Sequence, residues 1–206
     1  MEATKQPILE IYTEMTPNPE SMKFVVNKML LAGKSVDIRD EETLKLSPLA
    51  QRLFEHEYVN GVFVSANFIT ISKSTKKEWM EIIPELKQSI KNLLTEGIKV
   101  IDEKAYKAFV DKQEAEAASS GEQTDTVSKI KELLDTYVKP AVEMDGGAIQ
   151  FKSFNPESGK VTLVLQGACS GCPSSMLTLK AGIEGMLKRM LPEEVTEVVA
   201  ESEDDA

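Results

Sequence analysis

The pattern of apolar and polar positions in the first half of the chain predicts an antiparallel sheet packed with helices. Apolar and β-branched residues gather in four short runs that are typical of strands: residues 8–13, 22–26, 59–65 and 68–72. The segment Thr16-Pro17-Asn18-Pro19 between the first two runs predicts a rigid turn.

Two helices are expected in this part of the chain. Ser47 and Pro48 are typical of the cap and the first position of a helix that runs to Phe54. Residues 77–94 carry apolar side chains at helical spacing, with Pro84 predicting a bend. We therefore expect a first α+β domain over residues 1–97.

A change in composition marks the end of this domain. Residues 113–126, QEAEAASSGEQTDT, are small and polar and nearly free of large apolar side chains, which is typical of a flexible linker. Just before them, Tyr106, Phe109 and Val110 lie at helical spacing. We expect a linker over residues 98–125 that contains a short helix at about 102–112.

The second half repeats the mixture of helices and strands. The pattern predicts a helix that ends near Pro140, a turn at Asp145-Gly146-Gly147, a hairpin, a second helix and a last strand. Their expected ranges are 127–138, 148–154 with 160–166, 176–190 and 195–199. In the second helix we expect a buried stripe formed by Leu177, Leu179, Ile183, Met186 and Leu187.

The expected fold is therefore α+β, with two small domains, each an antiparallel or mixed sheet packed with helices, joined by a flexible polar linker. The second domain covers residues 126–200, and an acidic tail follows at 201–206.

The net charge of the chain argues against two classes of partner. The chain has 206 residues and a net charge of −10, from 34 acidic and 24 basic side chains. Nucleic acids and anionic membranes attract basic surfaces, so we expect neither as a partner. The first residues contain no apolar signal core and no Arg-rich amphipathic stretch, and no apolar run is long enough to span a bilayer. We accordingly expect a cytoplasmic protein.

The candidate chemistry lies in residues 167–175, GACSGCPSS, which contain both cysteines of the chain. Cys169 and Cys172 stand between a predicted strand and a predicted helix, with two small residues between them that permit a tight turn. Pro173 suits a first helical position, which places the thiols in an exposed loop at a helix N-terminus. That position stabilises thiolate over thiol and so favours soft metal ligation or redox chemistry.

Two readings of the cysteine pair involve no metal. A structural disulfide is disfavoured, because nothing in the sequence indicates secretion. A thiol–disulfide oxidoreductase would also place Cys-x-x-Cys between a strand and a helix. The second domain is too short for a thioredoxin fold, however, and the residue before Cys169 is Ala168, so no aromatic residue flanks the pair.

The number of ligands decides how a metal would be held. Zinc or a protein-bound iron–sulfur cluster needs about four ligands, and one chain offers two cysteines. The single histidine, His56, falls in the other domain, and we interpret it as an ordinary solvated residue. A metal centre would therefore take a Cys pair from each of two chains and lie in a dimer interface. Thiolate ligands fit an iron–sulfur cluster best and zinc second.

Several segments resemble a known family. Residues 144–147 (MDGG), 167–175 and 178–184 (TLKAGIE) resemble the C-terminal domain of NifU and the Nfu proteins. Residues 16–24 (TPNPESMKF), 47–50 (SPLA) and 68–73 (FITISK) resemble the Nfu N-terminal domain.

This resemblance implies a homodimer that binds a [4Fe–4S] cluster through Cys169 and Cys172 of both chains. It implies a scaffold or carrier without enzymatic activity, which receives a cluster from an upstream donor and passes it to apo client proteins. A [2Fe–2S] cluster or zinc remains an alternative cofactor. A thiol–disulfide oxidoreductase or a structural zinc-bridged dimer remains an alternative function.

Overall fold

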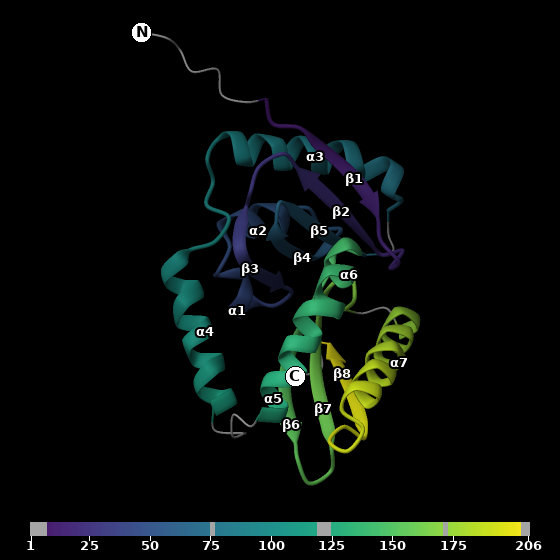
Figure 1. Ribbon diagram of the computed structural model, residues 1–206. Coiled ribbons are helices and arrows are strands. Elements are labelled where there is room, and N and C mark those ends of the chain that lie inside the picture. Colours follow the sequence, from purple (N-terminus) through teal and green to yellow (C-terminus); the bar gives the residue numbers. More distant parts are fainter. Residues whose placement is uncertain (1–7, 75–76, 119–124, 171–172, 203–206) are drawn as a thin grey trace.

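The computed structural model describes residues 8–74, 77–118, 125–170 and 173–202 and contains two sheets with their helices (Figure 1). We call the first sheet with its helices the N-terminal domain and the second sheet with its helices the C-terminal domain. None of the helices in these described segments is long and apolar enough to cross a membrane.

The N-terminal domain is a five-stranded antiparallel sheet in the order β1-β2-β5-β4-β3. Its strands are β1 (Ile11–Met15), β2 (Ser21–Val26), β3 (Leu31–Ile38), β4 (Val59–Ala66) and β5 (Phe68–Lys73). Its helices are α1 (Glu41–Leu44), α2 (Pro48–Leu53), α3 (Trp79–Thr95) and α4 (Glu103–Ala118).

One face of this sheet forms the core with the helices. Phe24 and Ile69 from the strands pack with Leu86 and Ile90 from α3, and all four side chains are fully buried. The predicted cap of α2 is confirmed, because the Ser47 hydroxyl accepts a hydrogen bond of 3.0 Å from the backbone N–H of Ala50.

Helix α4 is longer than the predicted 102–112 segment and continues to Ala118. Its Tyr106 and Phe109 pack against the core of the N-terminal domain, and the Tyr106 hydroxyl donates to the backbone oxygen of Ser35 at 3.2 Å. The first part of the predicted linker is therefore a helix attached to the N-terminal domain. Residues 119–124 of that linker lie outside the described part of the chain.

The C-terminal domain has a three-stranded mixed sheet in the order β6-β7-β8, with β8 parallel to β7. Its strands are β6 (Gly147–Asn155), β7 (Lys160–Gly167) and β8 (Glu197–Ser202). Its helices are α5 (Asp125–Leu133), the π-helical turn η1 (Leu134–Val138), α6 (Lys139–Met144) and α7 (Pro173–Met190).

Three details of this domain differ from the predictions. The first helix continues through η1 and α6 to Met144, because Pro140 falls in the first turn of α6, where a backbone N–H is not needed. Leu177, predicted as buried, is 69% exposed. Strand β8 extends to Ser202 and so takes in the first residues of the predicted acidic tail.

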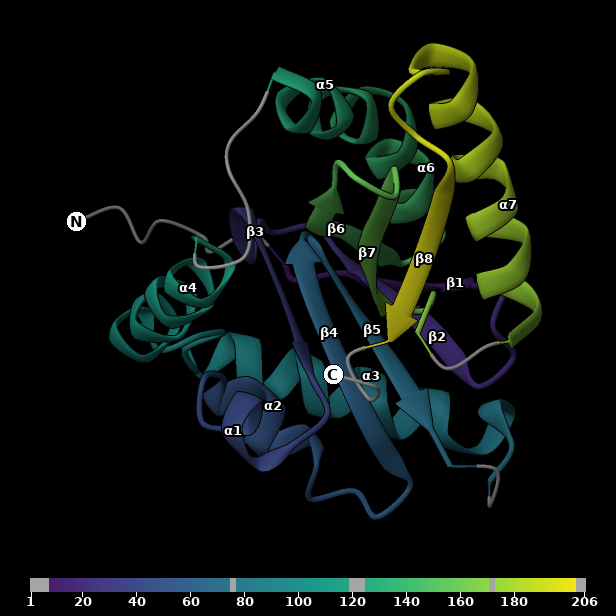
Figure 2. The same ribbon diagram turned by 90° about the horizontal axis from the view of Figure 1, so that it is seen from below.

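The C-terminal domain packs on the face of the N-terminal sheet opposite α1, α2 and α3 (Figure 2). Every residue of β2 and of β5 is buried, since one face of these strands meets the helices and the other meets the C-terminal domain. We call residues 167–170, which include Cys169, the cysteine loop, and this arrangement brings them against the N-terminal sheet.

Candidate functional site

Cys169 lies in the turn between β7 and α7, and its side chain belongs to the core of the C-terminal domain. It is 8% exposed. The prediction of an exposed loop is therefore wrong for Cys169, because the loop folds inward against both domains. Cys172, the second predicted ligand, lies outside the described residues. Helix α7 begins at Pro173, as predicted.

Two neighbouring glycines shape the space around Cys169. Gly146 has a φ of +83°, which confirms the predicted turn. A Cβ atom at Gly147 would lie 2.8 Å from Cys169 Sγ and 2.6 Å from the backbone oxygen of Gln166. Only glycine allows this approach of β6 to the thiol. From the sequence we interpreted these glycines mainly as a turn, and the contact of Gly147 with Cys169 adds a second reason for glycine here.

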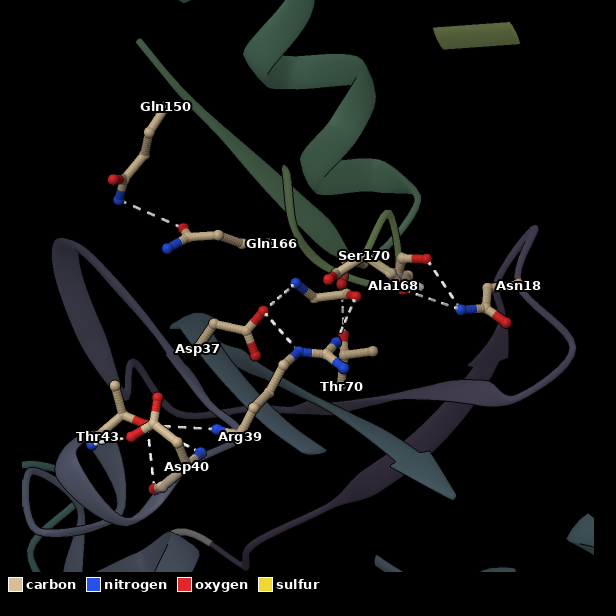
Figure 3. A network of polar contacts seen from close by, with 12 residues as sticks. Asn18, Asp37, Arg39, Asp40, Thr43, Thr70, Gln150, Gln166, Ala168 and Ser170 are labelled. Carbon is tan, nitrogen blue, oxygen red and sulfur yellow. Dashed lines mark hydrogen bonds and ion pairs between the residues drawn. The ribbon is translucent and has the colours of Figure 1, made fainter. Parts of the chain in front are cut away.

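Both backbone groups of Gly167, two residues before Cys169, are bound by side chains of the N-terminal domain. These two side chains, Asp37 and Arg39, are labelled in Figure 3. Its N–H donates to Asp37 Oδ2 at 2.7 Å, and its carbonyl accepts from Arg39 Nη2 at 3.0 Å. Arg39 Nε also donates to Asp37 Oδ2 at 3.2 Å. The Asp37 side chain is fully buried, and this ion pair offsets the cost of burying its charge.

Asn18 in the predicted rigid turn contacts the next part of the loop. Its Nδ2 donates to the backbone oxygens of Ala168 at 3.2 Å and Ser170 at 3.4 Å. Its Oδ1 accepts from the N–H of Glu20 at 2.9 Å and so holds the turn itself. The turn therefore positions an amide donor toward the cysteine loop.

Two further side chains of the sheet bind the segment that precedes β6. The Thr70 hydroxyl donates to the backbone oxygen of Gly146 at 2.7 Å. Lys23 Nζ donates to the backbone oxygens of Glu143 at 3.2 Å and Met144 at 3.0 Å. These carbonyls belong to the C-terminal end of α6, where a cation is favourable.

The apolar part of the contact between the domains is small. Val25, Phe63 and Phe68 of the N-terminal sheet form a separate buried cluster with Ala148 of β6. Hydrogen bonds from side chains of the N-terminal domain to the backbone of the loop form the polar part of the contact.

A cavity of about 420 Å³ opens beside Cys169, between α6, α7 and the predicted rigid turn. It is lined by Pro17, Ala141, Val142, Asp145, Ala168, Cys169, Thr178 and Leu179. Two large apolar side chains on the same helices face solvent, since Met144 is 76% exposed and Leu177 is 69% exposed.

His56 lies away from this site, in the N-terminal domain. Its Nε2 lies 3.0 Å from Ser89 Oγ, and its Nδ1 lies 3.3 Å from a Glu85 carboxylate oxygen. Its side chain is largely buried rather than solvated, which corrects the interpretation from the sequence. Glu85 also accepts from the Tyr58 hydroxyl, and burial together with this bond raises the pKa of Tyr58. Among the described residues no three His, Cys, Asp or Glu side chains gather as a metal site.

The chain is similar to known proteins along most of its length. It is 40% identical over 186 residues to "NifU-like protein 4, mitochondrial" of Arabidopsis thaliana, covering 89% of this chain and 63% of that protein. It is 38% identical over 197 residues to "NFU1 iron-sulfur cluster scaffold homolog, mitochondrial" of Homo sapiens, covering 95% of this chain and 74% of that protein. A solution NMR structure of a NifU-like protein from Saccharomyces cerevisiae is 30% identical, with a TM-score of 0.44, over 50% of this chain and 92% of that one.

The names of these relatives correct one prediction. We expected a cytoplasmic protein from the composition of the first residues. The Arabidopsis and human relatives are both named as mitochondrial, which points to mitochondria rather than to the cytoplasm, so that prediction is wrong. Targeting segments are removed from mature proteins, and the first residues of a sequence therefore do not decide its compartment.

Family models match both halves of the chain in the order that the resemblance implied. The model described as "Scaffold protein Nfu/NifU N terminal" matches residues 11–97. The model described as "NifU-like domain" matches residues 130–199, which include both cysteines. The chain therefore belongs to the Nfu/NifU family of scaffold proteins.

Proposed function

We propose that the chain binds an iron–sulfur cluster as its cargo through Cys169 and Cys172. It receives the cluster from an upstream donor and delivers it to apo client proteins, as a scaffold or carrier rather than as an enzyme. The human relative is named an iron-sulfur cluster scaffold homolog, which supports this role. The NifU-like model matches the segment that carries both cysteines, which supports the assignment of the site.

The observation that carries the proposal is the hydroxyl of Ser170, between the two cysteines. Ser170 is 1% exposed, and its buried Oγ has no hydrogen-bond partner among the residues that the structure describes. Buried polar groups are nearly always hydrogen-bonded, so this hydroxyl beside a thiol is available to a ligand that binds at the loop. A sulfur ligand or a cluster sulfide can accept that hydrogen bond, and such bonds tune iron–sulfur centres. The residues present thus fit the group.

We further propose that the cluster is of the [4Fe–4S] type and is shared by two chains in a homodimer. A cluster held by protein thiolates needs about four of them, and each chain has two cysteines. The exposed Met144 and Leu177 lie on the two helices that line the cavity beside Cys169, and they offer apolar surface next to the site. A second chain can cover that surface when the cluster joins the two loops.

The buried position of Cys169 bears on the main alternative. A thiol–disulfide oxidoreductase attacks through an accessible thiolate, whereas Cys169 is 8% exposed. A carrier has no such requirement at rest, because its loop needs to be accessible only while the cluster enters or leaves.

Anaerobic reconstitution tests the function directly. We expect about two iron and two sulfide per chain, because about four of each make up one shared cluster, with a Mössbauer spectrum of the [4Fe–4S] type. Cys169→Ser and Cys172→Ser should each lose the cluster, with circular dichroism reporting the fold separately. A variant that keeps full iron and sulfide contradicts the assignment of the site. Bound zinc without sulfide would establish the zinc-bridged dimer, and a disulfide couple without metal would establish the oxidoreductase.

A further inference from the structure

The face of the N-terminal sheet that meets the C-terminal domain carries polar side chains around a small apolar cluster. Residues alternate between the two faces of a strand, so Phe24 points into the helical core while its neighbour Lys23 points the other way. Ile69 and Thr70 of β5 alternate in the same manner. Polar residues on one face are typical of an antiparallel sheet with one side in water. Here that polar face is covered by the cysteine loop and the segment before β6.

The side chains of this face bind backbone atoms of the loop. Asn18 binds two loop carbonyls, Asp37 binds the Gly167 N–H and Arg39 binds the Gly167 carbonyl. We call these three side chains the loop clamp. Because these hydrogen bonds go to backbone atoms of Gly167, Ala168 and Ser170, the clamp fixes the path of the chain on both sides of Cys169.

The clamp joins two domains that each have a core of their own. Separate buried clusters lie in the N-terminal and C-terminal domains, and in the described part of the chain the buried apolar cluster between them consists of Val25, Phe63, Phe68 and Ala148. Interfaces that are polar and contain few apolar residues are typical of domains that associate reversibly. The contact can therefore open without unfolding either core.

The closed arrangement is incompatible with the exchange of a shared cluster. Cys169 is 8% exposed, and Pro17 of the N-terminal domain lines the cavity beside it. The sulfur atoms of two chains must approach one cluster, so the loop must present Cys169 outward at that moment.

We propose that the polar face of the N-terminal sheet is a reversible cover for the cysteine loop, held shut by the loop clamp. In the closed chain Cys169 is protected. When Asn18, Asp37 and Arg39 release the loop backbone, the loop becomes available to the loop of a second copy of this chain. That last step rests on the function proposed above, whereas the cover itself is a property of the iron-free chain.

Asn18→Asp is the most selective test of the clamp. An aspartate keeps the oxygen that accepts from the Glu20 N–H, but it replaces the amide donor with a carboxylate facing two carbonyl oxygens. Asn27→Asp is the matched control. Asn27 also accepts from a backbone N–H, that of Glu10, and donates to a backbone carbonyl, that of Ile8, but both partners lie in the N-terminal domain.

The measurement is the rate at which N-ethylmaleimide modifies Cys169 in the iron-free full chain, in a Cys172→Ser background that leaves one thiol. We expect Asn18→Asp to raise this rate about tenfold, because two hydrogen bonds of the closed state are lost and its population falls. Asn27→Asp should leave the rate within about twofold of the background, because its bonds lie in one domain. Equal rates in the two variants would overturn the proposal, since Cys169 would then be protected by the C-terminal core alone.

A second pair of variants guards against a folding defect in Asn18→Asp. Arg39→Lys keeps a cation beside Asp37 but removes the second arm that reaches the Gly167 carbonyl. Arg52→Lys makes the same change in an exposed pair with Glu55. Hydrogen exchange of the Gly167 and Ala168 amides should accelerate in Arg39→Lys and stay unchanged in Arg52→Lys. If exchange at these amides is the same in both, the clamp does not hold the loop.

These experiments contain no iron, so their outcome is separate from that of the proposed function. A chain that opens as described but binds no cluster would refute the carrier function and leave the cover intact. If the chain binds a cluster but the labelling rates are unchanged in the variants, the cover is refuted and the carrier function stands.

Discussion

The backbone N–H of Gly167 donates to the carboxylate of Asp37 at 2.7 Å, across a separation of 130 residues in the sequence. The carboxylate comes from β3 at the edge of one sheet and the amide from the end of β7 in the other. Because the Asp37 side chain is fully buried, this bond and the ion pair with Arg39 offset part of the cost of a charge that water cannot reach. The position of the cysteine loop thus depends on a strand that lies far away in the chain.

Ser170→Ala should have opposite effects on the iron-free and the loaded protein. The buried hydroxyl has no hydrogen-bond partner in the described part of the chain, so removing it should leave the stability of the iron-free protein unchanged or raise it by up to about 1 kcal/mol. In the loaded protein the same change removes a hydrogen bond to sulfur, so the cluster should be lost faster to a chelator. Urea unfolding and the decay of cluster absorbance measure the two effects.

Ser74→Ala is the matched control for this prediction, because Ser74 Oγ is also buried without a partner but lies in the N-terminal domain. It should match Ser170→Ala in the iron-free protein and leave cluster loss unchanged. If the two variants lose the cluster at the same rate, Ser170 makes no bond to it.

Gly167→Ala should destabilise the protein far more than Gly33→Ala. Both glycines have positive φ, +64° at Gly167 and +65° at Gly33, so both variants carry the backbone strain of about 1–2 kcal/mol that alanine meets there. A Cβ atom at Gly33 meets nothing within 4 Å, whereas at Gly167 it lies 2.8 Å from the Gly146 oxygen and 2.8 Å from the Phe63 ring. We expect an additional cost of about 1–3 kcal/mol for Gly167→Ala, measured by urea unfolding. Equal costs would mean that the Gly146 oxygen and the Phe63 ring both move aside at no cost.

The oligomeric state of the chain should depend on whether a cluster is bound. The proposed sharing of one cluster by two chains predicts an iron-free protein that is mainly monomeric and a loaded protein that is dimeric, because the cluster contributes to binding between the chains. Sedimentation velocity with iron measured per chain checks this, and a chelator should return the dimer to monomers. A monomer that carries about four iron atoms would refute the shared cluster, because other ligands would then complete the site.

Glu184→Gln should lower the free energy of unfolding at neutral pH and have no effect on it in acid. The Glu184 carboxylate accepts from Lys188 Nζ at 2.6 Å and from the Val198 N–H at 3.1 Å, and these bonds lower its pKa below the ordinary 4.5. A lowered pKa adds stability that is complete above about pH 4.5 and disappears as pH falls through the lower pKa of the folded state.

We expect a difference of at most about 1 kcal/mol between wild type and Glu184→Gln at pH 7, because the pair is partly solvated. The difference should shrink in urea unfolding series taken toward pH 3. Glu193→Gln makes the same change of charge at an exposed site nearby. A pH-dependent difference as large in Glu193→Gln would assign the effect to net charge.

The strands and helices with a clear period were predictable from the sequence. Strands β4 and β5 and helices α2 and α3 fall close to their expected ranges, because apolar side chains recur there with the spacing of one buried face. Strand β3 was not predicted. The residues that follow Leu31 are exposed at the edge of the sheet, so buried and exposed positions do not alternate there. This strand matters because it carries Asp37. A charged side chain is typical of the surface, but that of Asp37 is buried.

The burial of Cys169 could not be predicted from its neighbours in the sequence. Local features place the thiol between a strand and a helix, and both elements are present. Its surroundings come from Gly147 on β6 and from Pro17 in the other domain, which no local pattern connects to it. Likewise, Lys23 and Thr70 alternate with apolar residues as on a strand facing water, and only the docked domain buries them.

Strands β2 and β5 are buried on both faces and lie between the helical core on one side and the C-terminal domain on the other. Adjacent residues of one strand therefore belong to different cooperative units, so that Phe24 contributes to the melting of one domain and Val25 to its association with the other. When the C-terminal domain melts, the N-terminal sheet loses the cover of one face and should melt at a lower temperature than in the intact chain. The thermal unfolding of the two domains is therefore coupled through these strands. Calorimetry of the whole chain should show this coupling as an overlap of the two unfolding transitions.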